Sequence, residues 1–472
     1  MLRSRKTKIL LGLIFVLSIG LRLALVAFNR EANDAHETVA NLIIQSGELP
    51  QKDACWECFQ PKLFHYVFAR VLMIAGLEEN PGYQQNIIGQ LINFFASIAF
   101  LIVTWLFIDE IPLMDEKIKL LTFALVGLNP NLLGINSQAT NDTFAILFSS
   151  VSLFFAYEYF LQPKTRFIVL SLLFATSGIA SKTNAWVTAI AIFIALLIRT
   201  WVSNERKQKF SIIAIGFLLA TITLSLLNPL DQYIDNFQDY NSFVLMNINR
   251  DPFPHFTGEL SSGASGIWYI QDGFLTFKFL DLLKHPRLDP NTQELLPHQT
   301  SFWTVLYGRS QSIHFDNAPP AWSTTGETLF NLTRGVFLLG LIPTAMIIFG
   351  FFREAIFVGK SLIRKDVLLA RATSYGLFAA TAAGYIMFQM LYSFQYRSVT
   401  VIKAIFIFPA ILAFAYLFLN AANSLYGFSS ASGKRWLSLM FEIVIVVLLM
   451  LYVVDISTLI IDLAQVYINK HF

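Results

Sequence analysis

Residues 33–69 read NDAHETVANLIIQSGELPQKDACWECFQPKLFHYVFA and directly follow the first long hydrophobic segment of the chain. Asp34, His36 and Glu37 therefore come within a few residues of the point where the chain leaves a membrane. Titratable side chains are costly to keep near a membrane and frequently mark a functional site. Because hydrophobic segments occupy most of the remaining chain, this stretch is the first place where chemistry is expected.

The composition indicates the class of protein. Of the 472 residues, 55% are hydrophobic and only 14% are charged, whereas an average soluble domain has about 25% charged residues. Hydrophobic runs near the roughly 20 residues needed to cross a bilayer recur along the sequence. We therefore expect an all-α polytopic membrane protein with no nucleic-acid partner.

Eleven transmembrane helices are expected, counting the basic N-terminal segment as a retained first span rather than a cleaved signal peptide. The spans 166–181 and 183–201 come from a single apolar run broken at SKTN. If that run were one bent helix, the membrane orientation of every later span would be inverted. The expected spans are 9–29, 84–108, 117–135, 142–161, 166–181, 183–201, 210–228, 328–352, 367–391, 399–420 and 437–461.

Lys and Arg concentrate in the loops that this count places in the cytoplasm, as the positive-inside rule requires. Two long segments then face outward, 30–83 and 229–327. The expected organisation is an N-terminal module 1–228 that includes the first outer loop, the large outer loop 229–327 and the C-terminal helices 328–472. We expect the cell inner (plasma) membrane of a bacterium, with the active site on the periplasmic side.

The first outer loop ends in PKLFHYVFARVLMIAG, which predicts an amphipathic helix lying in the membrane interface, with His65 and Arg70 off its apolar face. The second outer loop is too long for a plain connector. Cys55 and Cys58 are the only cysteines. They indicate a local disulfide or two free thiols, because no second pair at zinc spacing accompanies them.

Carboxyl groups are the candidate bases. Asp34 and Glu37 lie three residues apart and would share a helix face, where a carboxylate can accept a proton from an attacking hydroxyl. Asp142 begins the fourth span on the same outer side. The alternative for all three is an acidic first-turn residue that favours the helix dipole.

Three cations fall at outer ends of spans, namely Lys182, Arg397 and Lys403. At that depth they could bind the phosphate of a lipid substrate. The alternative is snorkelling of their long side chains to the headgroups. Neither a phosphate-binding glycine loop nor a GxSxG or HExxH motif occurs, so the sequence does not support ATP-driven chemistry. It requires no cofactor, and it leaves the use of a divalent metal open without supporting it.

Taken together, several motifs resemble the GT-C superfamily of integral membrane glycosyltransferases, in the branch holding protein O-mannosyltransferases and lipid A aminoarabinose transferases. They are NDAHETVANLI after the first span, QPKLFHYVFA before a juxtamembrane helix, NPNLLGINSQATND and SKTN. The resemblance covers about the first half of the chain. The sequence departs from the family pattern where DAHE replaces an adjacent acidic pair and where Lys62 replaces a proline.

By this resemblance the fold would be a GT-C-type bundle with two large outward-facing loops. The function would be inverting transfer of a sugar from a polyprenyl-phosphate-linked donor to a lipid, glycan or protein acceptor, with Asp34 as general base. The further candidates for contacts with donor or acceptor are His36, His65, Arg309 and His314. Two alternatives remain: a flippase or transporter of lipid-linked sugars, and an O-antigen polymerase or ligase that uses Arg309, His298 and His314.

Overall fold

The computed structural model describes residues 5–29, 34–112, 114–203, 216, 229–241, 267–288, 296–312, 327–396 and 399–471. Every secondary-structure element in these ranges is an α-helix or a short 3-10 helix. The all-α architecture expected from the composition is therefore confirmed.

Eight helices within the described ranges are long and apolar enough to cross a membrane, and a bent pair adds a ninth if it counts as one span. The chain is thus a multi-pass helical membrane protein. The bent pair is α5 (Glu116–Gly127) with α6 (Pro130–Asn136), which meet at 53°. The eight helices are α1 (Arg5–Phe28), α4 (Gly82–Glu110), α7 (Asp142–Leu161), α9 (Trp186–Ser203), α15 (Glu327–Arg364), α17 (Leu377–Tyr396), α18 (Ile411–Ala431) and α19 (Trp436–His471).

The remaining two expected spans have different outcomes. The helix α8 (Thr165–Ser181) is apolar but has only 17 residues. The expected span 210–228 lies, apart from residue 216, outside the described residues. The number eleven therefore stays a prediction.

The chain reverses direction at the SKTN break, where the 3-10 helix η2 (Thr183–Ala185) separates α8 from α9. Lys182 lies beside Asp142 at the start of α7, whereas Arg199 of α9 lies over the ring of Tyr159 near the end of α7. The helices α8 and α9 therefore run antiparallel, and a single bent helix is excluded.

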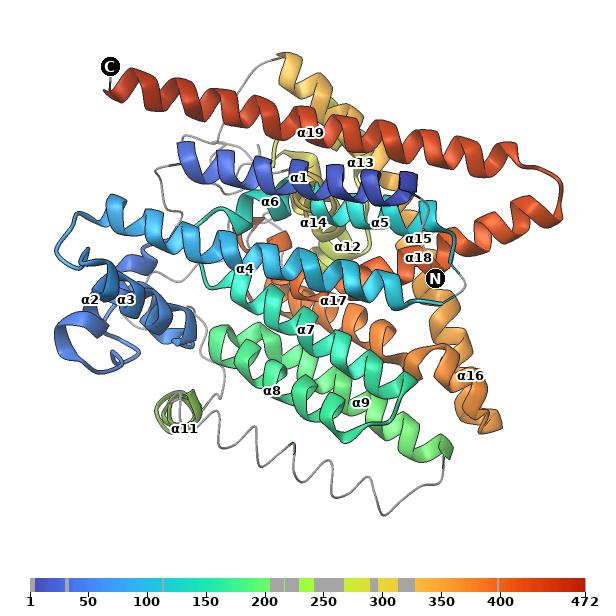
Figure 1. Cartoon of the computed structure of the whole chain (residues 1–472), viewed down its shortest axis with the longest axis horizontal. Helices are drawn as coiled ribbons and strands as arrows, with labels where there is room; N and C mark the ends of the chain where they lie inside the picture. Colours follow the sequence, from blue (N-terminus) through green and yellow to red (C-terminus); the bar gives the residue numbers. More distant parts are fainter. Residues whose placement is uncertain are drawn as a thin grey trace.

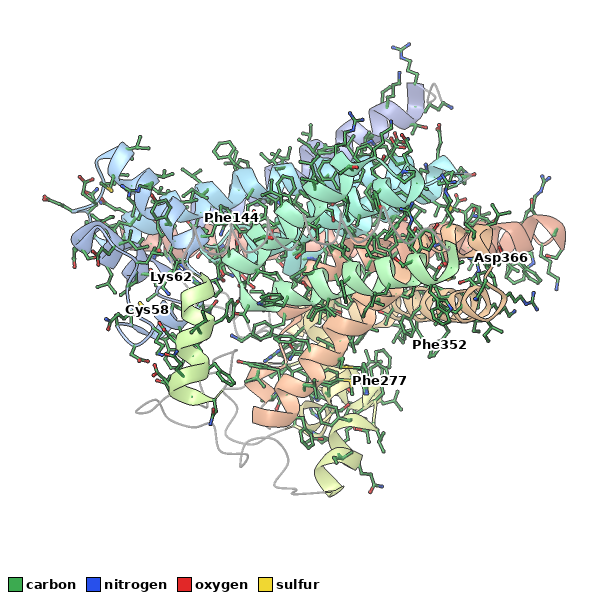
Figure 2. All side chains as sticks on the ribbon, turned by 90° about the horizontal axis from the view of Figure 1, so that it is seen from below. Cys58, Lys62, Phe144, Phe277, Phe352 and Asp366 are labelled. Carbon is green, nitrogen blue, oxygen red and sulfur yellow. A yellow bond between two sulfur atoms is a disulfide. The ribbon has the colours of Figure 1, made fainter. Side chains whose placement is uncertain are left out.

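The helices end at two opposite ends of the bundle (Figure 1). At one end Thr7 donates to Glu116 and Arg371 donates to the carbonyl oxygen of Leu161. We call the opposite end, where α2 (His36–Ser46) and α3 (Leu63–Ala75) lie, the site end. Figure 2 shows Cys58 and Lys62 at the site end and Asp366 at the other end.

The break between α5 and α6 is held by a buried arginine from α1. Ser18 Oγ and Arg22 Nη1 donate to the carbonyl oxygen of Gly127, at 2.6 and 2.9 Å, so one of the last carbonyls of α5 is satisfied where the helix stops. The Asn129 side chain then caps α6 by accepting from Leu132 N at 2.9 Å. This break directs the following segment, residues 137–141, to the site end.

The helix α3 packs into the protein by a face that includes a histidine. Phe64, His65, Phe68 and Leu72 are all fully buried, and they pack with the start of α7 around Phe144. The expectation that His65 lies off the buried face is wrong, because α3 contacts α2, α4 and α7 rather than only the membrane interface. Arg70 is exposed, as expected.

The described parts of the large outer loop are helical and pack on the bundle. Its elements are α11 (Pro229–Tyr240), α12 (Ile267–Phe274), α13 (Phe279–Lys284), η5 (Pro297–Thr300) and α14 (Phe302–Gln311). Asn129 donates to the carbonyl oxygen of Ser310 at 2.9 Å, which ties α14 to α6. Lys52 forms a salt bridge with Asp239 of α11, so the two expected outer loops touch each other. The division into three segments stays a prediction.

Short elements complete the C-terminal part before α18. They include the 3-10 helices that carry the chain from α17 back into the bundle, next to the site end. These elements are α16 (Val367–Ala372), η7 (Ser374–Gly376), η8 (Val399–Val401), η9 (Ala404–Phe406) and η10 (Phe408–Ala410).

Candidate functional site

An ion pair between Asp142 and Lys182 forms the centre of the site. Lys182 Nζ lies 2.5 Å from Asp142 Oδ1, and both side chains are almost fully buried. The second carboxylate oxygen of Asp142 accepts from Thr140 Oγ1 at 2.8 Å. Because the chain leaves α8 in an extended conformation at Lys182, this side chain turns toward the N-terminus of α7, where the helix dipole also favours the carboxylate.

A pair of buried histidines lies next to this ion pair. His36 Nδ1 is 2.9 Å from His65 Nε2, and the two rings stack with centroids 5.2 Å apart. Burial lowers the pKa of His36, while the nearby Asp34 and Asp142 raise it and Lys182 lowers it further. Burial and the neighbouring His36 likewise hold the pKa of His65 well below its usual range. Both rings are therefore neutral near pH 7.

The electrostatic contacts of His36 show that the structure brings Asp34 and Asp142 to one place. Both carboxylates and the ammonium group of Lys182 act on the same imidazole. Asp34 is only partly buried, and no hydrogen bond joins its carboxylate to another side chain in the part of the chain that the structure describes. A carboxylate placed in this way is accessible to a hydroxyl group from a substrate.

Glu37 points elsewhere. Its side chain packs against Gly82 at the start of α4. If residue 82 had a Cβ atom, that atom would lie 3.4 Å from Cγ of Glu37. Burial raises the pKa of Glu37. Its carboxyl is not among the groups that act on His36, so Asp34 and Glu37 do not form a shared acidic pair.

Glu57, which the sequence analysis does not single out, is a further carboxyl of the site. It lies on the 3-10 helix η1 (Trp56–Phe59) and only 5% of it is exposed. Burial raises the pKa of Glu57 to about 8, with Asp34 and Asp142 raising it and Lys182 and Lys403 lowering it. The signal in the sequence is its place between Cys55 and Cys58, which form a disulfide.

Lys403 reaches the site from the C-terminal half of the chain. It directly precedes η9, is half-buried, and acts on the carboxyl of Glu57. Lys182 lies 5.3 Å from the ring centroid of Phe406 on η9, which places the two lysines on neighbouring segments. Among the described residues Lys403 has no salt-bridge partner, so its charge is available to an anionic ligand.

Arg309 stabilises the backbone segment that leads to Lys403. The fully buried guanidinium donates from Nη1 to the carbonyl oxygens of Val399 and Ile402, at 3.0 and 2.7 Å, and from Nη2 to that of Leu288 at 3.0 Å. These contacts fix the backbone just before Lys403. Arg397 and His314, also expected at the site, lie outside the described residues.

The assembled site contains three carboxyls, two lysines and two neutral histidines at one end of a membrane bundle. Among the described residues, no group of three or more His, Cys, Asp or Glu side chains is arranged to hold a metal ion. The carboxylate of Asp34 can accept a proton, and the ammonium groups of Lys182 and Lys403 can pair with an anion such as a phosphate.

Comparisons with known proteins find similarity to solved structures. No protein-family model matches the sequence, and no curated protein matches it. The chain is similar to the crystal structure of ArnT from Cupriavidus metallidurans bound to undecaprenyl phosphate, with 13% sequence identity and a TM-score of 0.38 over 90% of this chain and 79% of that one. A likeness of this size assigns no activity.

Proposed function

We propose that this protein is an integral membrane glycosyltransferase that transfers a sugar from a polyprenyl-phosphate-linked donor to an acceptor hydroxyl outside the cytoplasm. The observation that carries the proposal is the meeting of Asp34 with Lys182 and Lys403 at the site end. Such a donor needs no nucleotide pocket, only cations for its phosphate and a base for the acceptor.

In the proposed reaction the acceptor oxygen attacks the anomeric carbon of the sugar while the bond from that carbon to the phosphate oxygen breaks. The acceptor proton moves to the carboxylate of Asp34, and the polyprenyl phosphate leaves with the bonding electron pair. Attack opposite the leaving group inverts the anomeric configuration. Lys403, which forms no salt bridge with any carboxylate in the described part of the chain, binds the phosphate, and Lys182 shares its charge between Asp142 and the leaving group.

The outward orientation is supported by two features of the site end. The disulfide between Cys55 and Cys58 is of the kind that persists in oxidising compartments such as the bacterial periplasm. The salt bridge between Lys52 and Asp239 joins the two long loops, which supports their lying on one side of the membrane. We therefore place the site on the periplasmic side of the inner membrane.

The alternative of an O-antigen polymerase or ligase gains no support from the described residues of the large loop. Arg309 donates to three backbone carbonyls, and the ring of His298 lies 2.6 Å from the carbonyl oxygen of Arg287. His298 thus contacts the backbone of the loop itself, and Arg309 joins the loop to the segment before η9.

The test is the substitution Asp34→Asn, which keeps shape and hydrogen bonding but removes basicity. General base catalysis contributes about 10²–10⁴-fold, so turnover should fall by at least about a hundredfold while lipid binding persists. Purified protein in lipid nanodiscs would be given a panel of polyprenyl-phosphate sugars, and release of free polyprenyl phosphate would be measured.

Asp53→Asn is the matched control, because Asp53 is exposed in the same outer loop. Turnover of Asp34→Asn within a few-fold of the wild type, in protein shown to be folded by its melting profile, would exclude Asp34 as the base.

A further inference from the structure

The carboxyl of Glu57 is held in the site by a closed turn. The disulfide between Cys55 and Cys58 joins the residues on either side of it. The ammonium group of Lys62 donates to the carbonyl oxygens of Cys58 and Gln60, at 2.6 and 3.1 Å. These contacts fix the turn from both sides, so Glu57 has little freedom to leave its buried position.

A hydrogen-bonded bridge connects Glu57 to the N-terminus of α7. The Gln60 amide nitrogen donates to Glu57 Oε2, and the Gln60 amide oxygen accepts from Asn141 Nδ2 at 2.6 Å. Asn141 directly precedes Asp142, the acidic partner of Lys182. The bridge therefore places the Glu57 carboxyl beside the groups that would bind and transfer the substrate.

The surroundings of Glu57 favour a neutral carboxyl near pH 7. Burial is the largest cause of its raised pKa, about 8. The two carboxylates Asp34 and Asp142 also raise this pKa and so oppose the lowering by Lys182 and Lys403. Oε2 accepts a hydrogen bond from Gln60 in either protonation state. A proton on Oε1 is then available for donation to a ligand.

We propose that Glu57 is a further ligand-binding residue of this site, which donates a hydrogen bond as a neutral carboxylic acid to the phosphate held by Lys403. The inference rests on the proposed function, because it takes the anionic ligand from there. A bound phosphate strengthens the preference for the protonated form, since a second negative charge beside the carboxyl disfavours its ionisation. By reciprocity, loss of that proton weakens binding of the phosphate.

The experiment compares binding of a long-chain polyprenyl phosphate at about pH 7 and about pH 9, on either side of the pKa of Glu57. Full-length protein in nanodiscs is titrated with the lipid phosphate, and with inorganic phosphate in a parallel series. For the wild type we expect affinity to fall about tenfold or more across this range, since a hydrogen bond to a charged group is replaced by repulsion.

Glu57→Gln keeps an N–H donor but cannot ionise, so its affinity should change less than about threefold over the same range, where a tenfold change corresponds to one full donor contact. Glu48→Gln serves as the control, because Glu48 is exposed in the same loop, and it should retain the pH dependence of the wild type. Equal losses of affinity in the wild type and Glu57→Gln would overturn the assignment.

Infrared difference spectroscopy on the wild type gives a readout that does not depend on folding of the variant. The band of a protonated carboxyl should be present at about pH 7, shift when polyprenyl phosphate is added, and disappear at about pH 9. Absence of such a band overturns the proposal. Binding of inorganic phosphate with the same pH step, but none of the lipid phosphate, supports Glu57 as a phosphate-binding residue and contradicts the lipid donor. No binding of either phosphate overturns both.

Discussion

Four cations of this bundle form two groups that differ in what they contact. Arg22 and Arg309 donate to backbone carbonyl oxygens, at the end of α5 and in the segment before η9. Lys182 and Lys403 instead lie beside carboxyl groups. An arginine on carbonyl oxygens satisfies groups that the fold would otherwise leave unpaired, whereas a lysine beside carboxyls offers charge that a ligand can share. Burial alone does not separate these two groups of cations, but their contacts do.

The largest effect that tests this comparison is on the pair Asp142 and Lys182. Removing either partner leaves the other charge buried, which typically costs about 3–5 kcal/mol of stability. We expect Asp142→Asn and Lys182→Met each to lower the free energy of unfolding by about this amount, and the double variant to regain most of it. Thermal and denaturant unfolding in detergent would measure all three.

The double variant also separates stability from function. It should remain without transferase activity, because the charge offered to the ligand is gone while the fold is restored. A double variant destabilised by the sum of the two single effects would show that the pair does not couple, and the comparison between the two groups of cations would then fail.

A smaller effect is expected when one cation from each group is removed. Lys403→Ala should weaken binding of polyprenyl phosphate about tenfold or more, the value of a charge-assisted contact of roughly 1.5–3 kcal/mol, with little change in melting temperature. Arg309→Met should lower the melting temperature, because three carbonyl oxygens lose their donor. Lipid titration and melting of each protein measure both quantities. If Lys403→Ala loses stability without losing lipid affinity, Lys403 stabilises the fold and does not bind the lipid phosphate.

Sequence patterns predicted the parts of this site that lie at helix ends. Asp34, Asp142 and Lys182 each stand where an apolar run begins or ends, and ends on one side of a membrane necessarily share a level. The structure adds that Asp142 and Lys182 are in contact. Hydrophobic periodicity also predicted most of the spans, because a membrane helix must satisfy its own backbone hydrogen bonds.

Positions that depend on long-range contacts were not predictable. Glu57 lies in a turn without periodicity, and it joins the site only through the bridge from Gln60 to Asn141, which lie 81 residues apart in the chain. Arg309 resembles a ligand-binding residue in the sequence, yet its acceptors include carbonyls 90 and 93 residues further along the chain. The inward direction of His65 follows from packing of α3 on α2, where its ring stacks on His36, and a single amphipathic pattern does not encode this contact.

The smallest expected effect concerns the neutral partners of these charges, His36 and His65. Burial lowers the pKa of both rings, so below about pH 6.5 the unfolded chain binds more protons than the folded protein. The contribution of the two rings to the free energy of unfolding is therefore complete above about pH 6.5. It is lost as the pH falls toward the pKa values of the folded state, by up to about 1.4 kcal/mol per pH unit for each ring. We expect the wild type to lose stability between about pH 6.5 and about pH 5, and His65→Asn to lose less.

His285→Asn, at an exposed histidine, should retain the slope of the wild type. Because the carboxyls of the site titrate in all three proteins, the difference between slopes isolates the buried ring. Equal slopes in the wild type and His65→Asn would mean that the pair carries a proton in the folded protein, and His36 and His65 would then belong with the cations of the site.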